Sequence, residues 1–233
     1  MKASFYKHRI GLNAASIFLC FLMLFSVSPV FAGAQVSSVV ECIRERYGHL
    51  PGLTVTYERE ILTRSMALLG DQIASDRATG QIHFKPPHYL RIEQETPSHE
   101  SVISNASILW WYIPEKKQAY RYPARKLGKE LRIFADIFQG LREAEEDFIL
   151  SLSSDAQGKE RQLELTPNPS WPDIDHITLY LAPEDCRIEK IEIYNVLGGM
   201  TRFKLGKERV EERFDASFFT FTPPEDIEVI RED

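Results

Sequence analysis

Residues 80–122 read GQIHFKPPHYLRIEQETPSHESVISNASILWWYIPEKKQAYRY, and this stretch decides the fold. Its apolar-polar alternation predicts strands on both sides of Pro86-Pro87, and a further break falls at Thr96-Pro97. The next strand, Leu109–Ile113, does not alternate, so both of its faces are apolar. A strand in an antiparallel meander needs only one apolar face against a core. We therefore expect a helix, another protein or a ligand to cover the second face.

The rest of the chain adds helices before and after this block. Apolar residues recur at helical spacing between Val36 and Tyr47, and again between Leu127 and Leu141. The stretch Glu143–Leu152 is expected to be helical at its start. Alternation predicts an early strand at 53–63 and later strands at 162–166, 174–182, 188–195, 201–207 and 218–222.

This order of elements predicts the α+β class. Strands and helices do not alternate one by one, which argues against a parallel α/β fold. So many strands cannot lie in one flat sheet without curling. We expect a strongly curved antiparallel sheet, an incomplete and half-open β-barrel, with helices covering its concave face.

The first 34 residues have the pattern of a secretory signal peptide. Lys2, Lys7 and Arg9 precede the apolar run Ile17–Phe25, and small residues at 30–34 allow cleavage after Ala32 or Ala34. The alternative, an uncleaved anchor, needs an apolar run of about 20 residues, which is longer than this one. Residues 35–233 are then expected to form a single domain in the periplasm.

The charge of the processed chain limits its partners. Removing three basic residues leaves 28 − 3 = 25 basic against 34 acidic residues, a net charge of −9. Nucleic acids and anionic lipid surfaces attract basic proteins. We therefore expect a protein that binds no nucleic acid and touches membranes only transiently. We also expect it to be a monomer.

Two cysteines, Cys42 and Cys186, remain after processing. In an oxidising compartment such a pair either forms a disulfide or stays as two separate buried thiols. The sequence leaves both possibilities open. A disulfide would join the N-terminal helix to a late strand.

The sequence carries no recognisable catalytic motif. Neither a nucleophile elbow, a zinc-binding helix motif nor a phosphate-binding glycine loop is present. His83 and His88 flank the diproline, but no third metal ligand accompanies them. We expect no catalytic residue, metal or cofactor. An enzyme such as a lipid hydrolase would need a polar cluster inside the barrel, and the sequence suggests none.

Aromatic residues are the unusual part of the composition. Most of them are expected to form a core, but a curved sheet under a helix can also enclose a ligand. Apolar ligands gain about 0.8 kcal/mol for each buried methylene group. A few acyl chains could then be bound tightly without any catalytic residue.

Three segments together resemble the LolA family of periplasmic lipoprotein carriers. They are the opening strand Leu53–Arg59, parts of the block from Gly80 to Gln118 that include Gly80–Pro87 and Leu109–Pro114, and the C-terminal Phe219–Val229. Their order and spacing carry the resemblance more than any single motif does. The resemblance covers most of the processed chain.

The resemblance implies a half-open barrel with a helical lid over an apolar cavity. It also implies a carrier that takes lipoprotein acyl chains from an inner-membrane releasing complex to an outer-membrane acceptor. A carrier or sensor of another lipid or glycolipid on the same fold is the alternative. The expected cavity wall comprises Val55, Tyr57, Phe84, Leu90, Ile92 and one of Trp110 and Trp111. The expected lid face comprises Leu131, Phe134, Ile137, Phe138 and Leu141.

One position departs from the family pattern. The family typically has an arginine just before the proline that ends the second strand, and this arginine fastens the lid through backbone carbonyls. Here that position is Pro86, which has no donor group. Either Lys85 or Arg91 takes its place, or the lid is held by apolar contacts alone.

Overall fold

One curved sheet carries most of the chain. The computed structural model describes residues 30–64, 66, 76–105, 107–123, 129–142, 144–154, 161–215 and 217–231. Within these residues twelve strands form one sheet in the order β12-β6-β5-β4-β3-β2-β1-β11-β10-β9-β8-β7. The strands are β1 Leu53–Leu62, β2 Asp76–Lys85, β3 Tyr89–Thr96, β4 Glu100–Asn105, β5 Ile108–Ile113, β6 Gln118–Pro123, β7 Phe148–Ser154, β8 Arg161–Pro167, β9 Ile174–Leu181, β10 Ile188–Asn195, β11 Met200–Val210 and β12 Glu228–Arg231.

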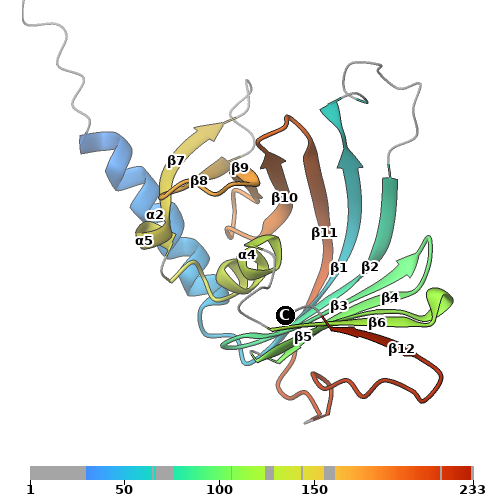
Figure 1. The fold of residues 1–233 in the computed structure, drawn as a ribbon. Helices are drawn as coiled ribbons and strands as arrows, with labels where there is room; N and C mark the ends of the chain where they lie inside the picture. The colour runs from blue at the N-terminus through green and yellow to red at the C-terminus, as the bar shows by residue number, and fades with distance from the viewer. Residues whose placement is uncertain are drawn as a thin grey trace, which may run out of the picture.

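The sheet bends into a half-barrel that stays open (Figure 1). Neighbouring strands are antiparallel except β12 and β6, which are parallel. The register shifts between Val55 and Tyr57 against β11, and between Thr79 and Gly80 against β3. Such bulges increase the local twist of a sheet. A side chain at Gly80 would collide with the carbonyl oxygen of Glu93, so glycine permits the close approach here.

Helices cover the concave side and one end of the sheet. Helix α2 (Val30–Tyr47) packs beside β7, α4 (Lys129–Phe138) lies within the curve, and α5 (Ala144–Asp147) precedes β7 (Figure 1). A short 3-10 turn, η2 (Pro114–Lys116), joins β5 to β6. The predicted fold class is therefore confirmed. Residues 1–29, which hold most of the predicted signal peptide, lie outside the described part of the chain.

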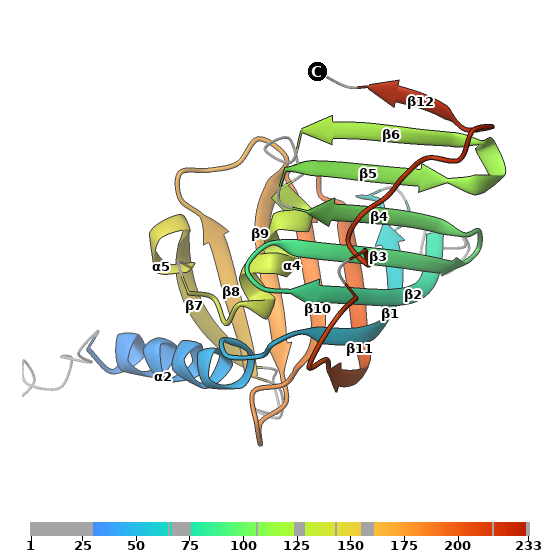
Figure 2. The ribbon, with the colours of Figure 1, turned by 90° about the horizontal axis from the view of Figure 1, so that it is seen from below.

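The C-terminal segment covers the outer face of the sheet. After β11 the chain crosses the convex side of the half-barrel before it pairs with β6 as β12 (Figure 2). The predicted strand 218–222 is wrong, because residues 217–219 form a turn and 220–222 pair with no strand. Around this turn the amide of Phe218 donates to Asp215 and that of Thr220 to Ser217. The aromatic side chains of this segment pack on the sheet while its backbone stays out of the ladder.

The stretch after α4 also differs in part from the prediction. It is helical at its start, in α5, as expected. From Phe148 onward it continues as β7, the edge strand, which pairs with β8. Most of the segment between Ser65 and Arg77, which joins β1 to β2, lies outside the described residues.

Candidate ligand-binding site

The register between neighbouring strands determines which side chains lie on the concave face. Residues opposite each other in neighbouring strands lie on the same face of a sheet. The pairings therefore place one apolar row across five strands, from Val55 through Ile82, Ile92 and Val102 to Trp111. Strand alternation adds a second position from β1, because Tyr57 points the same way as Val55.

Helix α4 fills one part of this concave face. The ring of Phe134 meets Phe203 of β11 edge to face, with centroids 4.9 Å apart. The ring of Phe138 lies 6.0 Å from Phe84 of β2 and 6.1 Å from Tyr47 of α2. The apolar stripe of the helix therefore packs directly against the strands and α2.

The structure brings most of the predicted site residues together. Eight of them are at most 4% exposed and belong to one apolar cluster, and two more pack against it partly buried. Here α4 packs directly against the wall, so a ligand that used these surfaces would have to displace α4. The eight are Val55, Tyr57, Phe84, Leu90, Phe134, Ile137, Phe138 and Leu141, and the two are Ile92 and Leu131.

The two tryptophans lie on opposite faces. Trp111 faces the concave side, where its ring stacks on Tyr120 at 5.3 Å and its Nε1 donates to Glu100 at 3.0 Å. Trp110 faces outward and packs edge to face against Phe221 at 5.5 Å. Of the two alternatives that the sequence left open, Trp111 and not Trp110 is therefore the one on the concave face. The cover of the second apolar face is the C-terminal segment rather than a helix.

Sequence reasoning missed part of the concave face. Tyr120 and Tyr122 of β6 stack at 6.4 Å and extend the surface of Trp111 away from α4. All three side chains are only partly buried. The alternation within β6 could have indicated them once the inward tryptophan was known.

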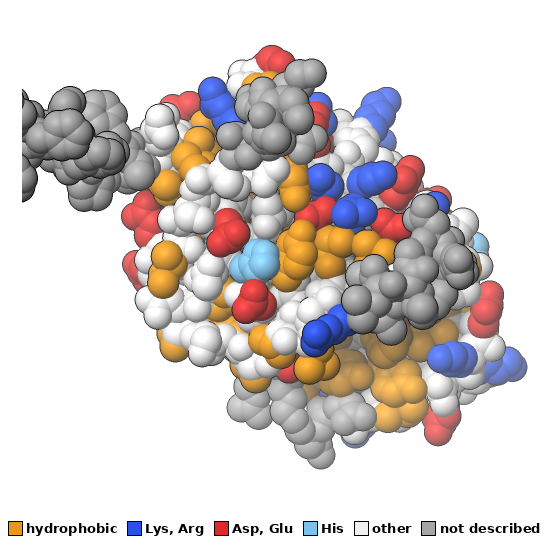
Figure 3. Space-filling view, turned by 90° about the horizontal axis from the view of Figure 1, so that it is seen from above, with side chains coloured by type: hydrophobic (Ala, Val, Ile, Leu, Met, Phe, Trp, Pro, Cys, Tyr) orange, Lys and Arg blue, Asp and Glu red, His pale blue; other side chains and the backbone are white. Residues whose placement is uncertain are grey.

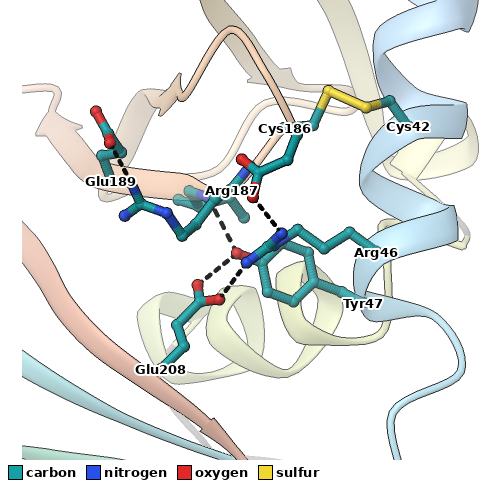
Figure 4. A network of polar contacts seen from close by, with 9 residues as sticks. Cys42, Arg46, Tyr47, Cys186, Arg187, Glu189 and Glu208 are labelled. Carbon is teal, nitrogen blue, oxygen red and sulfur yellow. Dashed lines mark hydrogen bonds and ion pairs between the residues drawn. A yellow bond between two sulfur atoms is a disulfide. The ribbon is translucent and has the colours of Figure 1, made fainter.

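Helix α2 is fastened to the sheet by a polar network and a disulfide (Figure 4). Arg46 donates to Asp185 at 2.6 Å and to Glu208 at 2.8 Å. The hydroxyl of Tyr47 donates to Glu208 at 2.6 Å and accepts from the amide of Ile188 at 3.0 Å. Burial, reinforced by the Glu208 carboxylate, raises the pKa of Tyr47 well above its ordinary value.

The cysteines, whose state the sequence left open, are joined in the structure. Cys42 of α2 and Cys186, in the turn before β10, form a disulfide with their Cα atoms 6.0 Å apart. The bond lies close to the network of Arg46 and Tyr47 (Figure 4). The C-terminal half of α2 is therefore a fixed support for whatever packs on it.

The C-terminal end of α4 rests on this support. Gly140 has a φ of 77° and approaches the backbone of Arg44 and Gly48 so closely that a Cβ atom would meet it. The guanidinium of Arg142 donates to the carbonyl oxygen of Gly48. This end of the helical cover is therefore bonded to α2.

The predicted substitutes for the missing arginine act elsewhere. Arg91 lies on the outer face, where it donates to Glu93 at 2.8 Å and to the carbonyl of Phe218 at 2.9 Å. Lys85 lies over the ring of Tyr89. Within the part of the chain that the structure describes, neither residue bonds to α4. The other expectation, that apolar contacts alone hold the lid, is also wrong, because Arg142 adds a hydrogen bond to the carbonyl oxygen of Gly48.

These features define a class of protein. An apolar half-barrel with an amphipathic helix in its concave face is suited to binding apolar ligands. The described residues contain no group of three His, Cys, Asp or Glu side chains that could hold a metal ion. None of the helices described has both the length and the apolar character needed to span a membrane.

Comparison with known proteins places the chain within this class. The family model described as "Outer membrane lipoprotein carrier protein LolA" matches residues 68–222, so the chain belongs to the LolA family. A relative from Francisella tularensis subsp. novicida, named outer-membrane lipoprotein carrier protein, is 21% identical over 216 residues, which are 93% of this chain and 97% of the relative. A relative of the same name from Dechloromonas aromatica is 25% identical over 157 residues, covering 67% of this chain and 73% of its own.

A solved structure shares the fold. An uncharacterized conserved protein from Thermus thermophilus aligns with a TM-score of 0.52 and 11% identity. The alignment covers 85% of this chain and 99% of that protein. At this level of identity the similarity concerns the fold alone.

Proposed function

We propose that this protein binds the acyl chains of lipoproteins and carries them through the periplasm from the inner to the outer membrane. Membership of the LolA family supports the class of cargo. The observation that carries the proposal is the apolar stripe of α4, which occupies the concave face of an apolar half-barrel. A ligand of similar chemistry would take the place of that stripe.

Burying the apolar side chains of α4 and burying an acyl chain contribute similar free energies. Burying Phe134, Ile137 and Phe138 contributes about 1.5–3 kcal/mol for each side chain, or about 5–9 kcal/mol together. An acyl chain that buries about a dozen methylenes at about 0.8 kcal/mol each gains about 10 kcal/mol. Replacing the helix by the ligand therefore changes the free energy little. Such a small difference suits a carrier, because a carrier must release what it binds.

The attachments of α4 suggest how the site opens. Its C-terminal end is bonded to α2 through Arg142 and lies against Gly48 at Gly140. Toward its N-terminal end α4 meets the sheet through apolar contacts, as between Phe134 and Phe203, and an exposed bond at 3.1 Å joins Arg132 to Asp147 of α5. We expect the N-terminal end to move away from the sheet, with Gly140 and Leu141, both at positive φ, as the pivot.

The sequence and the disulfide support the proposed compartment. The predicted signal peptide would direct the chain across the inner membrane, and a disulfide is stable in the oxidising periplasm. Partners of the proposed carrier are an inner-membrane complex that releases lipoproteins and an outer-membrane acceptor. No catalytic residue is part of the proposal.

The two adjacent tryptophans provide a matched test. Trp111→Ala removes an aromatic ring from the concave face, whereas Trp110→Ala removes the same ring from the outer face. Uptake of a fluorescent triacylated lipopeptide by the purified protein should fall about tenfold in Trp111→Ala, equivalent to about 1.4 kcal/mol. It should stay near the wild-type value in Trp110→Ala.

Other results would contradict the proposal. Wild-type protein that takes up no acylated ligand, and that carries none in native mass spectrometry after purification, is not a carrier of this kind. Equal loss of uptake in both tryptophan variants, with unchanged circular dichroism, would place the ligand elsewhere. In cells, depletion of the protein should leave lipoproteins in the inner membrane.

A further inference from the structure

Arg59 is a charged residue on the concave face. In β1 it is paired with Phe203 of β11 and Ala78 of β2, so it points to the same side as Tyr57. Phe203 in turn touches Phe134 of α4 at 4.9 Å and Tyr57 at 5.7 Å. The guanidinium group therefore lies next to the apolar space that α4 occupies.

This guanidinium group is incompletely paired. Its Nε atom is buried and has no hydrogen-bond partner. Its ion pair is long, with Nη2 3.8 Å from Oδ1 of Asp76, whose side chain is 60% exposed. A buried donor without an acceptor costs free energy, so an acceptor that reaches Nε would be favoured.

Other arginines of the molecule are better satisfied. Arg202 donates to Glu192 at 2.7 Å and to Glu60 at 3.0 Å on the outer face. Arg46 also has an unpartnered Nε, but its two terminal nitrogens are bonded to carboxylates at 2.6 and 2.8 Å. Of these three, Arg59 combines a weak partner with a position beside an apolar site.

The surface near the concave face is mixed in charge. Seen from above, basic and acidic side chains lie together beside an exposed apolar area (Figure 3). An acidic residue, Glu100, also lies toward the concave side, but it accepts from Trp111 at 3.0 Å and from Ser98 at 3.4 Å. The ion pair that Arg59 makes is with Asp76.

We propose that Arg59 binds the anionic group of a diacyl lipid, such as the phosphate of a phospholipid, while the acyl chains occupy the concave face. This inference rests on the proposed function, because the chains must enter where α4 now packs. The planar guanidinium group matches the oxygens of a phosphate or carboxylate in two parallel hydrogen bonds. The cargo would then include anionic lipids as well as acylated proteins.

The experiment is a competition between two lipids with identical acyl chains. The purified protein is mixed with vesicles of equal parts phosphatidylglycerol and phosphatidylcholine, separated from them, and analysed for bound lipid by mass spectrometry. Wild-type protein should retain the anionic lipid with a preference of about tenfold. Arg59→Gln should retain both lipids almost equally.

Two further variants sharpen the competition. Asp76→Asn removes the competing carboxylate and should raise the preference for phosphatidylglycerol, and it tests the proposal even if Arg59→Gln fails to fold. Arg77→Gln makes the same change of charge on β2, where the side chain is 78% exposed and pairs with Glu60, and should behave as wild type.

Each outcome has a distinct meaning. A preference that survives in Arg59→Gln overturns the inference, as does equal retention of the two lipids by wild type, and both leave the proposed function intact. Absence of any bound phospholipid overturns the inference alone if the protein still takes up the triacylated lipopeptide, and overturns the proposed function as well if it does not. Inorganic phosphate, compared with chloride at equal ionic strength, should leave the preference unchanged. If phosphate abolished it, Arg59 would be a site for free anions rather than for a lipid.

Discussion

Glu93 lies on the outer face of β3 between two basic groups. Its Oε2 is 3.6 Å from Nε2 of His83, and its Oε1 is 2.6 Å from Nη2 of Arg91. His83 and Arg91 lower the pKa of Glu93 to about 2, although partial burial acts in the opposite direction. Arg91 also bonds to the carbonyl of Phe218, so the carboxylate helps to position the C-terminal segment.

The lowered pKa predicts how stability depends on pH. Because the folded protein favours the ionised carboxylate, the stabilisation is complete above about pH 4.5 and is lost as the pH falls toward about 2. Glu93→Gln should therefore reduce the acid sensitivity of the midpoint of thermal unfolding over this range. Glu95→Gln, a change of a more exposed residue of the same strand, serves as control. Parallel pH profiles for Glu93→Gln and wild type would contradict the assignment.

Trp110 and Trp111 show what a sequence can predict at this scale. Their apolar surroundings predicted correctly that both faces of β5 are covered. Which ring faces inward depends on the register of β5 with β4 and β6, and that register depends on side chains far away in sequence. Alternation does place Arg91 on the face opposite Leu90 and Ile92. Its bond to the carbonyl of Phe218 could not be predicted, because the two residues are 127 apart in the chain.

Helix α4 is the element on which binding depends. Its apolar stripe was predictable because helical periodicity is a local property of the sequence. Its attachment through Arg142 to Gly48 was not predictable, since it joins residues 94 apart in the chain. The strand predicted at 218–222 failed for a related reason. Its aromatic residues pack on the outer face of the sheet, as Phe221 does on Trp110 and Tyr112, but its backbone does not pair as a strand.

Two truncations along the stripe of α4 should have unequal effects. Phe138, which touches Phe84, Tyr47 and Phe134, is fully buried, so Phe138→Ala should destabilise the fold by about 3–5 kcal/mol. Leu131→Ala, at the partly exposed end, should cost less than about 2 kcal/mol. Urea denaturation followed by circular dichroism measures both. Equal losses would mean that α4 is packed uniformly along its length.

The two faces of the sheet have different roles in the molecule. The concave face carries the candidate site, and the outer face is covered by the C-terminal segment, which ends as β12 at the edge of the sheet (Figure 2). The curved antiparallel architecture followed from the number and order of strands. The parallel pairing of β12 with β6 did not, because a four-residue strand has too little pattern to indicate its partner.

Cysteine alkylation tests the disulfide and the predicted processing together. The full chain has three cysteines, and Cys20 lies within the predicted signal peptide. Secreted protein that is unfolded without reductant should take up no iodoacetamide, because Cys42 and Cys186 are bonded. After reduction it should take up two alkyl groups if cleavage follows Ala32 or Ala34, and three if the segment is retained.

The same bond should contribute measurably to stability. It joins residues 144 apart, and a cross-link that closes a loop of this order restricts the unfolded chain by about 4–5 kcal/mol. The double variant Cys42→Ala/Cys186→Ala should unfold at lower urea concentration by that amount, and reduced wild type should match it. The loss should not abolish folding, since Arg46 and Tyr47 still bond α2 to Glu208. Alkylation of unreduced wild type at two sites, together with unchanged stability in the double variant, would contradict both the bond and its role in fixing α2.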